Sequence, residues 1–404
     1  MADAGKRESF IPVRKSDLIA LLCGDPALAD DERQELEQLC RLIVSTFHFE
    51  FHARLQQLTD AYALFDPDAD TRPLRQPSEA EQRQQIDSLF EQFGALLERG
   101  NYLRLSHDDI VQALNEASEW GLRLDVDFSV FERLEMFVRG DEVTRRTRRR
   151  WRNRLRLEQV EVPVYQRLVV IFRLRPQRTP GPHADAKAMH VKVFKGILKK
   201  DLEMLLPGTR VRLSLADRGR IILPALSGVL LTAWKIVQGA LTIAAAGAYG
   251  ALAFLGLVGG TIGYGVRSFF GYVHTKQKYQ LSLTQSLYYQ NLDNNAGALF
   301  RVLDDAEEQE CREALLAYYV LWREAGERGC SRAELDRLVE DLLERKLGVR
   351  VDFEIGDAID KLKRLQLVDE LPDDGWRAVP MAECLKRLDR AWDGFFQYAG
   401  SCGG

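Results

Sequence analysis

Cysteine and histidine are scarce in this sequence, and neither is grouped. The 404 residues contain six of each. No Cys-x-x-Cys pair provides zinc-ligand spacing, so we interpret the cysteines as reduced packing residues of a reducing compartment. His48 and His52 stand one helical turn apart, but the sequence offers no third ligand beside them. We therefore predict neither a metal site nor a bound cofactor.

Signals for a leader and for catalysis are missing as well. Met1–Glu8 contains no apolar stretch and is too acidic for a typical transit peptide, so we expect no cleaved leader. The sequence has no glycine loop that would cradle a phosphate after a strand, and no nucleophile elbow. These absences favour a protein that is not an enzyme.

Charge is strongly segregated along the chain, although the net charge is only −4. Residues 139–220 carry 22 Lys and Arg against 8 Asp and Glu, whereas residues 1–138 and 293–404 are both acidic. The basic block directly precedes the most apolar part of the sequence. This placement makes contact with an anionic surface near that segment one interpretation of the basic block, beside pairing with the acidic regions.

One long apolar segment is the most distinctive feature of the chain. From Ile221 to Val266, 46 residues include a single charge, Lys235. One helix of that length would run about 69 Å at ~1.5 Å per residue, whereas a bilayer core is ~30 Å thick and needs about 20 residues per crossing. We therefore predict a hairpin of two transmembrane helices over residues 219–266, with its turn near Gln238-Gly239.

Small residues gather in the second predicted transmembrane helix, where glycines four residues apart let another helix approach closely. The packing residues that we predict are Gly256, Gly259, Gly260 and Gly263. Packing of the hairpin against itself is one interpretation, and a homo-oligomer formed through this face is the other. Basic residues flank both ends, so both termini should be cytoplasmic in a multi-pass protein of a bacterial inner membrane, or lie on the equivalent side of the mitochondrial inner membrane.

Two regions precede the predicted hairpin. Residues 1–124 are predicted to be a helical N-terminal region, because apolar residues recur at helical spacing. The helices that we predict are Glu32–Asp60, Ile86–Arg99 and His107–Trp120. Residues 125–218 are predicted to form a small basic α+β domain. Its predicted strands are Phe128–Val138, Val160–Leu174 and Met189–Leu198.

An arginine run lies between two of these strands and has three interpretations. Its members are Arg145, Arg146, Arg148, Arg149, Arg150, Arg152, Arg154 and Arg156. The first interpretation is a solvated face whose arginines pair with the acidic regions. The second is contact with anionic lipid headgroups, where each basic group gains roughly 1 kcal/mol. The headgroup-contact residues would be Arg145, Arg146, Arg148, Arg149, Arg150 and Arg152. The third is binding of nucleic-acid phosphates, which we do not expect because aromatic stacking residues are sparse.

After the predicted hairpin, residues 267–305 are expected to form a connecting helical region and residues 306–397 a winged-helix-like domain. The pattern of that domain is helix, helix, helix, hairpin, helix, and Pro372–Gly375 provides the hairpin turn. Its third helix, Phe353–Leu365, mixes acidic and basic residues within an acidic region. Because such a surface would repel DNA, we interpret the domain as a protein-interaction module.

Three stretches of the sequence together resemble one membrane-protein family. They are Arg7-Glu8-Ser9-Phe10-Ile11-Pro12, Phe194-Lys195 followed by Asp201-Leu202-Glu203-Met204-Leu205-Leu206-Pro207, and Tyr288-Tyr289-Gln290-Asn291-Leu292-Asp293-Asn294-Asn295. From about Arg7 to Leu321 the chain is similar to the family, defined by a domain of unknown function, that includes transmembrane protein 143. The resemblance implies a two-span membrane protein and transfers no catalytic residues.

These patterns together predict an α+β membrane protein. We expect a membrane-anchored interaction or scaffold protein that contacts the lipid bilayer, anionic headgroups and an unidentified protein partner. One alternative is a membrane-bound enzyme that uses the acidic stretch of residues 293–310 to hold a divalent ion. The carboxylates concerned are Asp304, Asp305, Glu307, Glu308 and Glu310. The other alternative is a membrane-tethered regulator that binds nucleic acid through the arginine run.

Overall fold

The chain forms two compact units, and each is described by itself. The computed structural model describes residues 7–71, 73–75, 77–106, 108–110, 123–149, 157–176, 187–199, 202, 205–207, 209–212, 234, 263, 288–372 and 374–394. The larger unit consists of residues 1–106, 131–197 and 292–404, and the smaller unit of residues 107–130 and 198–291.

The larger unit begins with three helices: α1 (Lys15–Cys23), α2 (Asp30–Tyr62) and α3 (Glu79–Arg99). α3 starts with a capping box, in which the Glu81 amide donates to Ser78 Oγ at 3.3 Å and the Ser78 amide donates to Glu81 Oε2 at 2.7 Å. The apolar residues of α2 that recur at helical spacing are buried, which confirms the helix predicted over Glu32–Asp60.

A five-stranded antiparallel sheet lies at the centre of the larger unit. Its strands, in the order β1-β3-β4-β5-β7, are β1 (Leu103–Arg104), β3 (Phe131–Arg149), β4 (Leu157–Leu174), β5 (Met189–Leu198) and β7 (Asn291–Asn294). The strands expected over Phe128–Val138 and Val160–Leu174 are present, except that Phe128–Val130 forms a 3₁₀ turn, and Met189–Leu198, expected to be of strand or mixed character, is a strand. However, Arg145–Arg149 was expected to connect strands and instead belongs to β3. Pairing with β4 continues as far as Arg149↔Leu157, and this partner strand overrides the weak strand pattern of the arginines.

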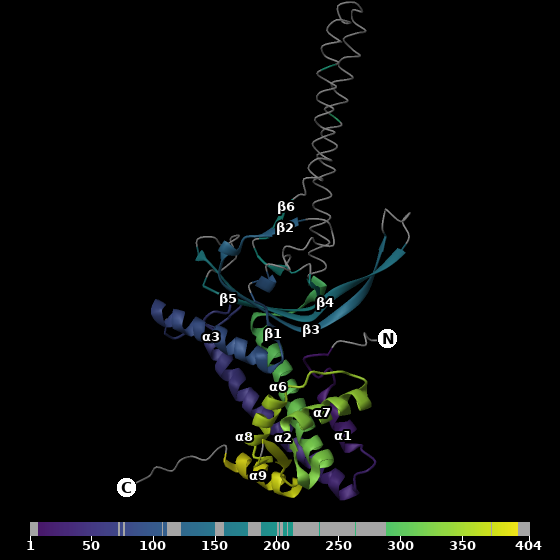
Figure 1. Ribbon diagram of the computed structural model, residues 1–404. Coiled ribbons are helices and arrows are strands. Elements are labelled where there is room, and N and C mark those ends of the chain that lie inside the picture. Colours follow the sequence, from purple (N-terminus) through teal and green to yellow (C-terminus); the bar gives the residue numbers. More distant parts are fainter. Residues whose placement is uncertain are drawn as a thin grey trace, which may run out of the picture. The chain divides into compact units, whose positions relative to one another are not determined.

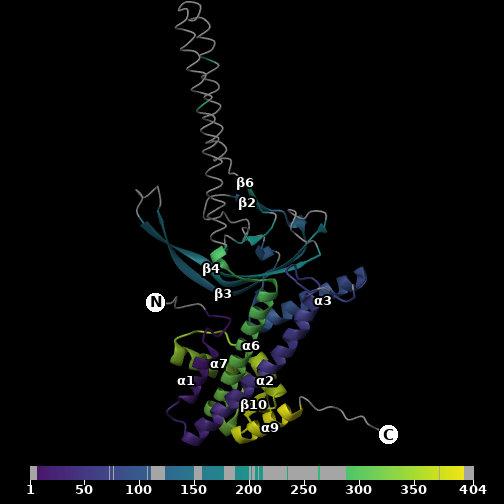
Figure 2. The same ribbon diagram turned by 180° about the vertical axis from the view of Figure 1, so that it is seen from behind.

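Helices cover one face of this sheet, and the main hydrophobic core contains residues of both the helices and the sheet. Met189, Val191 and Val193 alternate along β5 and are fully buried in that core, as the period of two requires. Figures 1 and 2 show α2, α3 and α6 (Asn295–Val320) on the same side of the sheet. The core also includes residues from the N-terminal and C-terminal helices, so segments far apart in sequence share it.

The C-terminal part of the larger unit contains helices and a β-hairpin around a small sheet. α6 continues as a π-helical turn (Leu321–Ala325) and a 3₁₀ turn (Gly326–Arg328). The elements that follow are β8 (Cys330–Ser331), α7 (Arg332–Leu347), α8 (Ile355–Arg364), β9 (Val368–Leu371), β10 (Gly375–Ala378) and α9 (Met381–Gly394). The predicted order of helices and hairpin is confirmed, and the small sheet has the order β8-β10-β9. α6 begins 11 residues before the predicted helix, at Asn295.

The described part of the smaller unit includes two paired strands. β2 (Arg123–Val126) and β6 (Thr209–Arg212) are antiparallel, with Arg123 opposite Arg212 and Val126 opposite Thr209. A 3₁₀ turn, Phe128–Val130, follows β2. Leu202, Leu205 and Leu206 are buried.

The fold class predicted from the sequence requires a correction. Residues 219–266, assigned above to a transmembrane hairpin, lie outside the described residues except for Trp234 and Gly263. Within the part of the chain that the structure describes, no helix combines the length and the apolar composition needed to cross a bilayer. The described fold is mixed helix and sheet and includes no transmembrane hairpin, so the predicted hairpin, the membrane assignment and the multi-pass localisation are withdrawn. The prediction rested on hydropathy alone, a property that an apolar segment shares with a protein core.

Candidate functional site

The densest group of polar side chains lies along α6. Five carboxylates of this helix, which we call the α6 carboxylate ladder, are Asp305, Glu307, Glu308, Glu310 and Glu313. Glu307, Glu310 and Glu313 are buried and follow one another at three-residue spacing. Residues at this spacing are neighbours on a helix, so the buried charges are concentrated on one side of α6.

The start of α6 is fixed by Asn295. This residue has a φ of 49°, in the left-handed region that asparagine tolerates better than most residues. Its side chain donates to Asp68 Oδ2 at 2.6 Å and accepts from the Val191 amide at 3.3 Å. The hydroxyl of Tyr62 donates to the same amide oxygen at 3.4 Å. Asn295 therefore connects α6 to β5 and to the end of α2.

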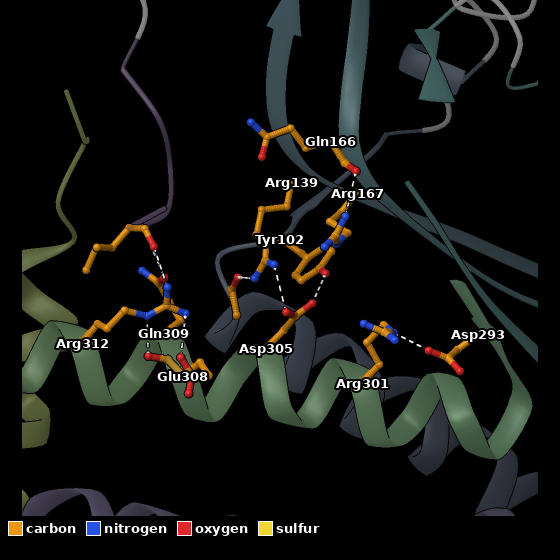
Figure 3. A network of polar contacts seen from close by, with 12 residues as sticks. Tyr102, Arg139, Gln166, Arg167, Asp293, Arg301, Asp305, Glu308, Gln309 and Arg312 are labelled. Carbon is orange, nitrogen blue, oxygen red and sulfur yellow. Dashed lines mark hydrogen bonds and ion pairs between the residues drawn. The ribbon is translucent and has the colours of Figure 1, made fainter. Parts of the chain in front are cut away.

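Asp305 contacts the hydroxyl of Tyr102 and the guanidinium of Arg139 (Figure 3). Tyr102 donates its hydroxyl to Asp305 Oδ2 at 2.7 Å, and Arg139 on β3 lies 3.1 Å from Oδ1. The Arg139 guanidinium also lies 4.9 Å from the ring centre of Phe10 and 4.6 Å from that of Tyr102. Burial raises the pKa of Tyr102, so its hydroxyl stays a donor at neutral pH. The arrangement fixes β3 to α6.

The next turn of α6 holds the N-terminal strap, which we define as Arg7–Val13. Arg312 donates to the carbonyl oxygens of Ile11 at 2.7 Å and Val13 at 2.6 Å, and the Ile11 amide donates to Gln309 at 3.2 Å. Figure 3 shows the side chains of Arg312 and Gln309 pointing toward the strap. At its other end the strap pairs with the linker between α7 and α8: the Glu8 amide donates to the Arg350 carbonyl, and the Asp352 amide to the Glu8 carbonyl, each at 2.8 Å.

Glu313 of the ladder forms a deeply buried ion pair with Lys361 on α8. Their side chains are 1% and 5% exposed. Glu313 also accepts from Gln309 at 2.7 Å and from Asn101 at 3.1 Å, while Lys361 forms a second ion pair with Asp357 at 2.6 Å. Burial raises the pKa of the Glu313 carboxyl. Burial opposes the charge of Lys361, but its carboxylate neighbours offset that effect and raise its pKa.

The remaining carboxylates of the ladder contact basic side chains of the N-terminal helices. Glu310 accepts from Arg99 at the end of α3, at 2.7 Å. Lys15 of α1 lies 3.1 Å from Glu308 and 3.7 Å from Glu307, and Glu307 also lies 3.2 Å from His48 Nδ1 on α2. The three N-terminal helices therefore each contact the ladder.

These contacts bear on whether the ladder could hold a metal ion. Among the described residues, no group of three or more His, Cys, Asp and Glu side chains is placed to hold a metal ion. Asp304, the fifth carboxylate of the divalent-ion alternative, is exposed and lies outside the ladder. His48 faces Glu307, and the structure brings no third ligand to His48 and His52 among the residues it describes. The ladder joins elements to one another, so the divalent-ion alternative has no support there.

The other residues predicted from the sequence are placed only in part. Arg145, Arg146, Arg148 and Arg149 lie on β3. Arg150 and Arg152 lie outside the described residues, as do Gly256, Gly259 and Gly260, whereas Gly263 is described as a single helical residue. The headgroup contact and the glycine packing therefore stay untested predictions.

Sequence reasoning missed the strap and its anchors, which are Gln309, Arg312 and Asn101, whose side chain donates to the Ser9 carbonyl at 2.8 Å. The only signal for the strap was the resemblance of Arg7–Pro12 to a family stretch. The stretch Tyr288–Asn295 gave a similar signal, and it contains β7 and the fixed start of α6. Both stretches therefore hold the fold together.

Comparison with protein families gives a match to part of the chain. Residues 165–297 match a family described as "Protein of unknown function (DUF3754)". The matched segment includes most of β4, all of β5 and β7, and Asn295. No solved structure matches the chain. These findings give a domain family for residues 165–297, and they do not extend to the transmembrane protein 143-like family.

Proposed function

We propose that this chain is a non-enzymatic interaction or scaffold protein and that its winged-helix-like region, α6 to α9, is the docking module. The observation that carries the proposal is that the cations of α8 form ion pairs with carboxylates of the protein itself. Lys361 is buried in an ion pair with Glu313, and Arg364 is engaged by Glu50 of α2. Both positive charges are therefore neutralised within the protein.

The outer residues of α8 support a protein partner. Asp360 is exposed, Asp357 is half-exposed in its ion pair with Lys361, and Lys363 lies 4.8 Å from the ring centre of Trp376. A winged helix that reads DNA needs an unpaired basic surface on this helix to neutralise phosphates. The basic residues of α8 are instead engaged by carboxylates, and Asp360 repels phosphates and attracts a basic segment, so the partner proposed here is a protein with a basic docking segment.

The ion pairs of α6 favour a non-enzymatic role. A catalytic carboxylate needs room for a substrate and a pKa suited to proton transfer. The ladder carboxylates instead contact arginine, lysine or histidine side chains of neighbouring elements. This is the pattern of structural ion pairs.

We also propose a relationship between this chain and the transmembrane protein 143-like family. The family match over residues 165–297 includes Tyr288–Asn295, one of the three stretches that resemble the transmembrane protein 143-like family. That overlap supports a relationship between the two groups. It assigns no reaction and no ligand to the chain.

Crosslinking of the full chain in native extract, followed by mass spectrometry, tests the docking module. We expect partner crosslinks to concentrate on α8 and the adjacent β9–β10 hairpin and to weaken with salt. Asp360→Lys should reduce partner recovery severalfold. Asp389→Lys on α9, also at an exposed position, is the matched control. Equal recovery with both variants would exclude α8 as the docking surface.

A further inference from the structure

Two of the buried cysteines are in contact with each other. Cys23 is the last residue of α1 and Cys40 lies within α2, and both belong to the main hydrophobic core. α1 packs against α2, and the thiols of Cys23 and Cys40 are hydrogen-bonded to each other. The two residues are not a Cys-x-x-Cys pair in the sequence, so the fold alone brings their sulfur atoms together.

The two thiols differ in how closely they approach solvent. Cys23 is 5% exposed and Cys40 is 1% exposed. Cys23 is followed by a turn in which Gly24, Pro26 and Ala27 are exposed. Helix ends and exposed turns open locally at a lower free energy than the core of a protein. Cys23 is therefore the sulfur that a small molecule from solvent reaches first.

The surroundings of Cys23 favour its thiolate form. Cys40 donates a hydrogen bond to the Cys23 sulfur, which lowers the pKa of the Cys23 thiol, and the Arg33 guanidinium acts in the same direction. Arg33 is adjacent, because its Nε donates to the Cys23 carbonyl at 3.0 Å. Burial and the charge of Glu37 oppose these effects without cancelling them.

Cys40 is the opposite case. Its hydrogen bond with Cys23 raises the pKa of the Cys40 thiol, and burial raises it further, so Cys40 keeps its proton at neutral pH. The pair therefore combines one nucleophilic sulfur with one protonated sulfur in contact with it. Cysteines that sense oxidants often have this arrangement of an attacking thiolate and a second cysteine nearby.

We propose that Cys23 and Cys40 are a thiol oxidation site, at which a hydroperoxide converts the pair into a reversible disulfide. The Cys23 thiolate attacks an oxygen of the hydroperoxide and the O–O bond breaks. Cys23 becomes a sulfenic acid, and the leaving oxygen takes up the proton that Cys23 released to solvent.

The second step completes the disulfide. The Cys40 sulfur attacks the Cys23 sulfur, the S–O bond breaks as the S–S bond forms, and the sulfenic oxygen leaves as water with the Cys40 proton. The two thiols together lose two electrons, and the hydroperoxide is reduced to an alcohol, or to water when it is hydrogen peroxide.

The disulfide joins α1 to α2 covalently. α1 directly follows the strap, and it contacts α6 through the ion pair of Lys15 and Glu308. A cross-link of this kind restricts the unfolded chain and so stabilises the folded one. Oxidation should therefore raise the Tm and slow the proteolysis of the N-terminal helices, and reduction of the disulfide should reverse both effects.

Oxidation of the folded full chain with hydrogen peroxide, followed by blocking of free thiols, tryptic digestion and mass spectrometry, tests the proposal. Trypsin cleaves after Arg33, so the disulfide appears as a link between the peptides Ser16–Arg33 and Gln34–Arg41, which dithiothreitol separates. Burial raises the pKa of Cys330 and Cys384 to about 11. We therefore expect the link to form at least about tenfold faster than either of these thiols is oxidised in the same chain.

Three variants separate the roles of the sulfur atoms. Cys40→Ser removes the second thiol, so Cys23 should stop at the sulfenic acid and react with the sulfenic-acid probe dimedone. Cys23→Ser should give neither the link nor a dimedone adduct on Cys40. Cys330→Ser is the matched control, because Cys330 is 6% exposed, and it should form the link at the wild-type rate. Circular dichroism of each variant reports its fold.

Three outcomes would overturn the proposal, and all of them are measured on the wild-type chain. Absence of the link after oxidation of the folded protein would leave the two thiols as packing residues. A link that forms only in urea would be a property of the unfolded chain. Oxidation of Cys330 and Cys384 as fast as the link forms would show that the pair has no special reactivity.

Discussion

The buried pair of Glu313 and Lys361 allows a quantitative test of the ladder. Lys361→Met removes the positive charge but keeps an unbranched side chain of similar length, so Glu313 is left 1% exposed without its cation. Breaking a buried ion pair from one side costs about 3–5 kcal/mol, because the remaining charge is uncompensated. Glu313→Gln should cost less, about 1.5–3 kcal/mol, because Lys361 keeps its ion pair with the half-exposed Asp357.

The cost of Lys361→Met should depend on pH. Burial already raises the pKa of Glu313 above 4.5 in the folded protein, and loss of Lys361 raises it further. The folded state then binds a proton that the unfolded state has released. Stability of the variant therefore falls as pH rises from about 4.5 to the folded pKa, by at most ~1.4 kcal/mol per pH unit. We expect the variant to lose more stability at pH 8 than at pH 5.

Urea titration of the full chain, followed by far-ultraviolet circular dichroism at pH 5 and pH 8, provides the measurement. The matched control is Lys386→Met on α9, where the lysine is exposed. The double variant Glu313→Gln/Lys361→Met should recover about 1–3 kcal/mol relative to Lys361→Met alone. A Lys361→Met variant as stable as the control, or one whose loss is the same at both pH values, would refute the reasoning.

Three further predictions concern other parts of the larger unit. Arg312→Gln removes the charged donor to two strap carbonyls. Urea titration should therefore show that the free energy of unfolding falls by about 2–3 kcal/mol, and limited proteolysis should show faster cleavage near the N-terminus. Cleavage at the wild-type rate would contradict the role of Arg312 in holding the strap. Tyr319→Phe removes the hydrogen bond that lowers the pKa of Asp25, whose stabilising effect is present above pH 3.8 and is lost as pH falls through the folded pKa. The variant should therefore be less stable than wild type at pH 7, by about 1 kcal/mol, with a smaller difference at pH 3. Burial raises the pKa of Cys330 and Cys384 to about 11, so neither thiol should react with a disulfide reagent before unfolding.

Local patterns predicted much of the helical structure. The helices over Glu32–Asp60 and Ile86–Arg99 were found because apolar spacing and caps are encoded in neighbouring residues. The same holds for the β9–β10 hairpin, whose turn residues lie between two short apolar strands. In each case the information lies within a few residues of the element.

Contacts between distant segments could not be predicted in this way. Tyr102 and Asp305 are separated by 203 positions, and nothing in either local sequence identifies the other. β7 is equally hidden, because Asn291–Asn294 has no strand pattern and becomes a strand by pairing beside β5. The acidic residues of α6 were recognised, but their role depends on cations that the fold brings from other elements.

The strap also has a consequence for how the chain is made. Ile11 contacts Gln309 and Arg312, which follow it by 298 and 301 positions. At about 5–20 residues per second, a ribosome needs roughly 15–60 s to add 300 residues. During that interval Ile11, buried in the finished protein, lacks its contacts with α6. A chain truncated before Asn295 lacks all the α6 residues of the core, so we expect it to be much less stable than the full chain.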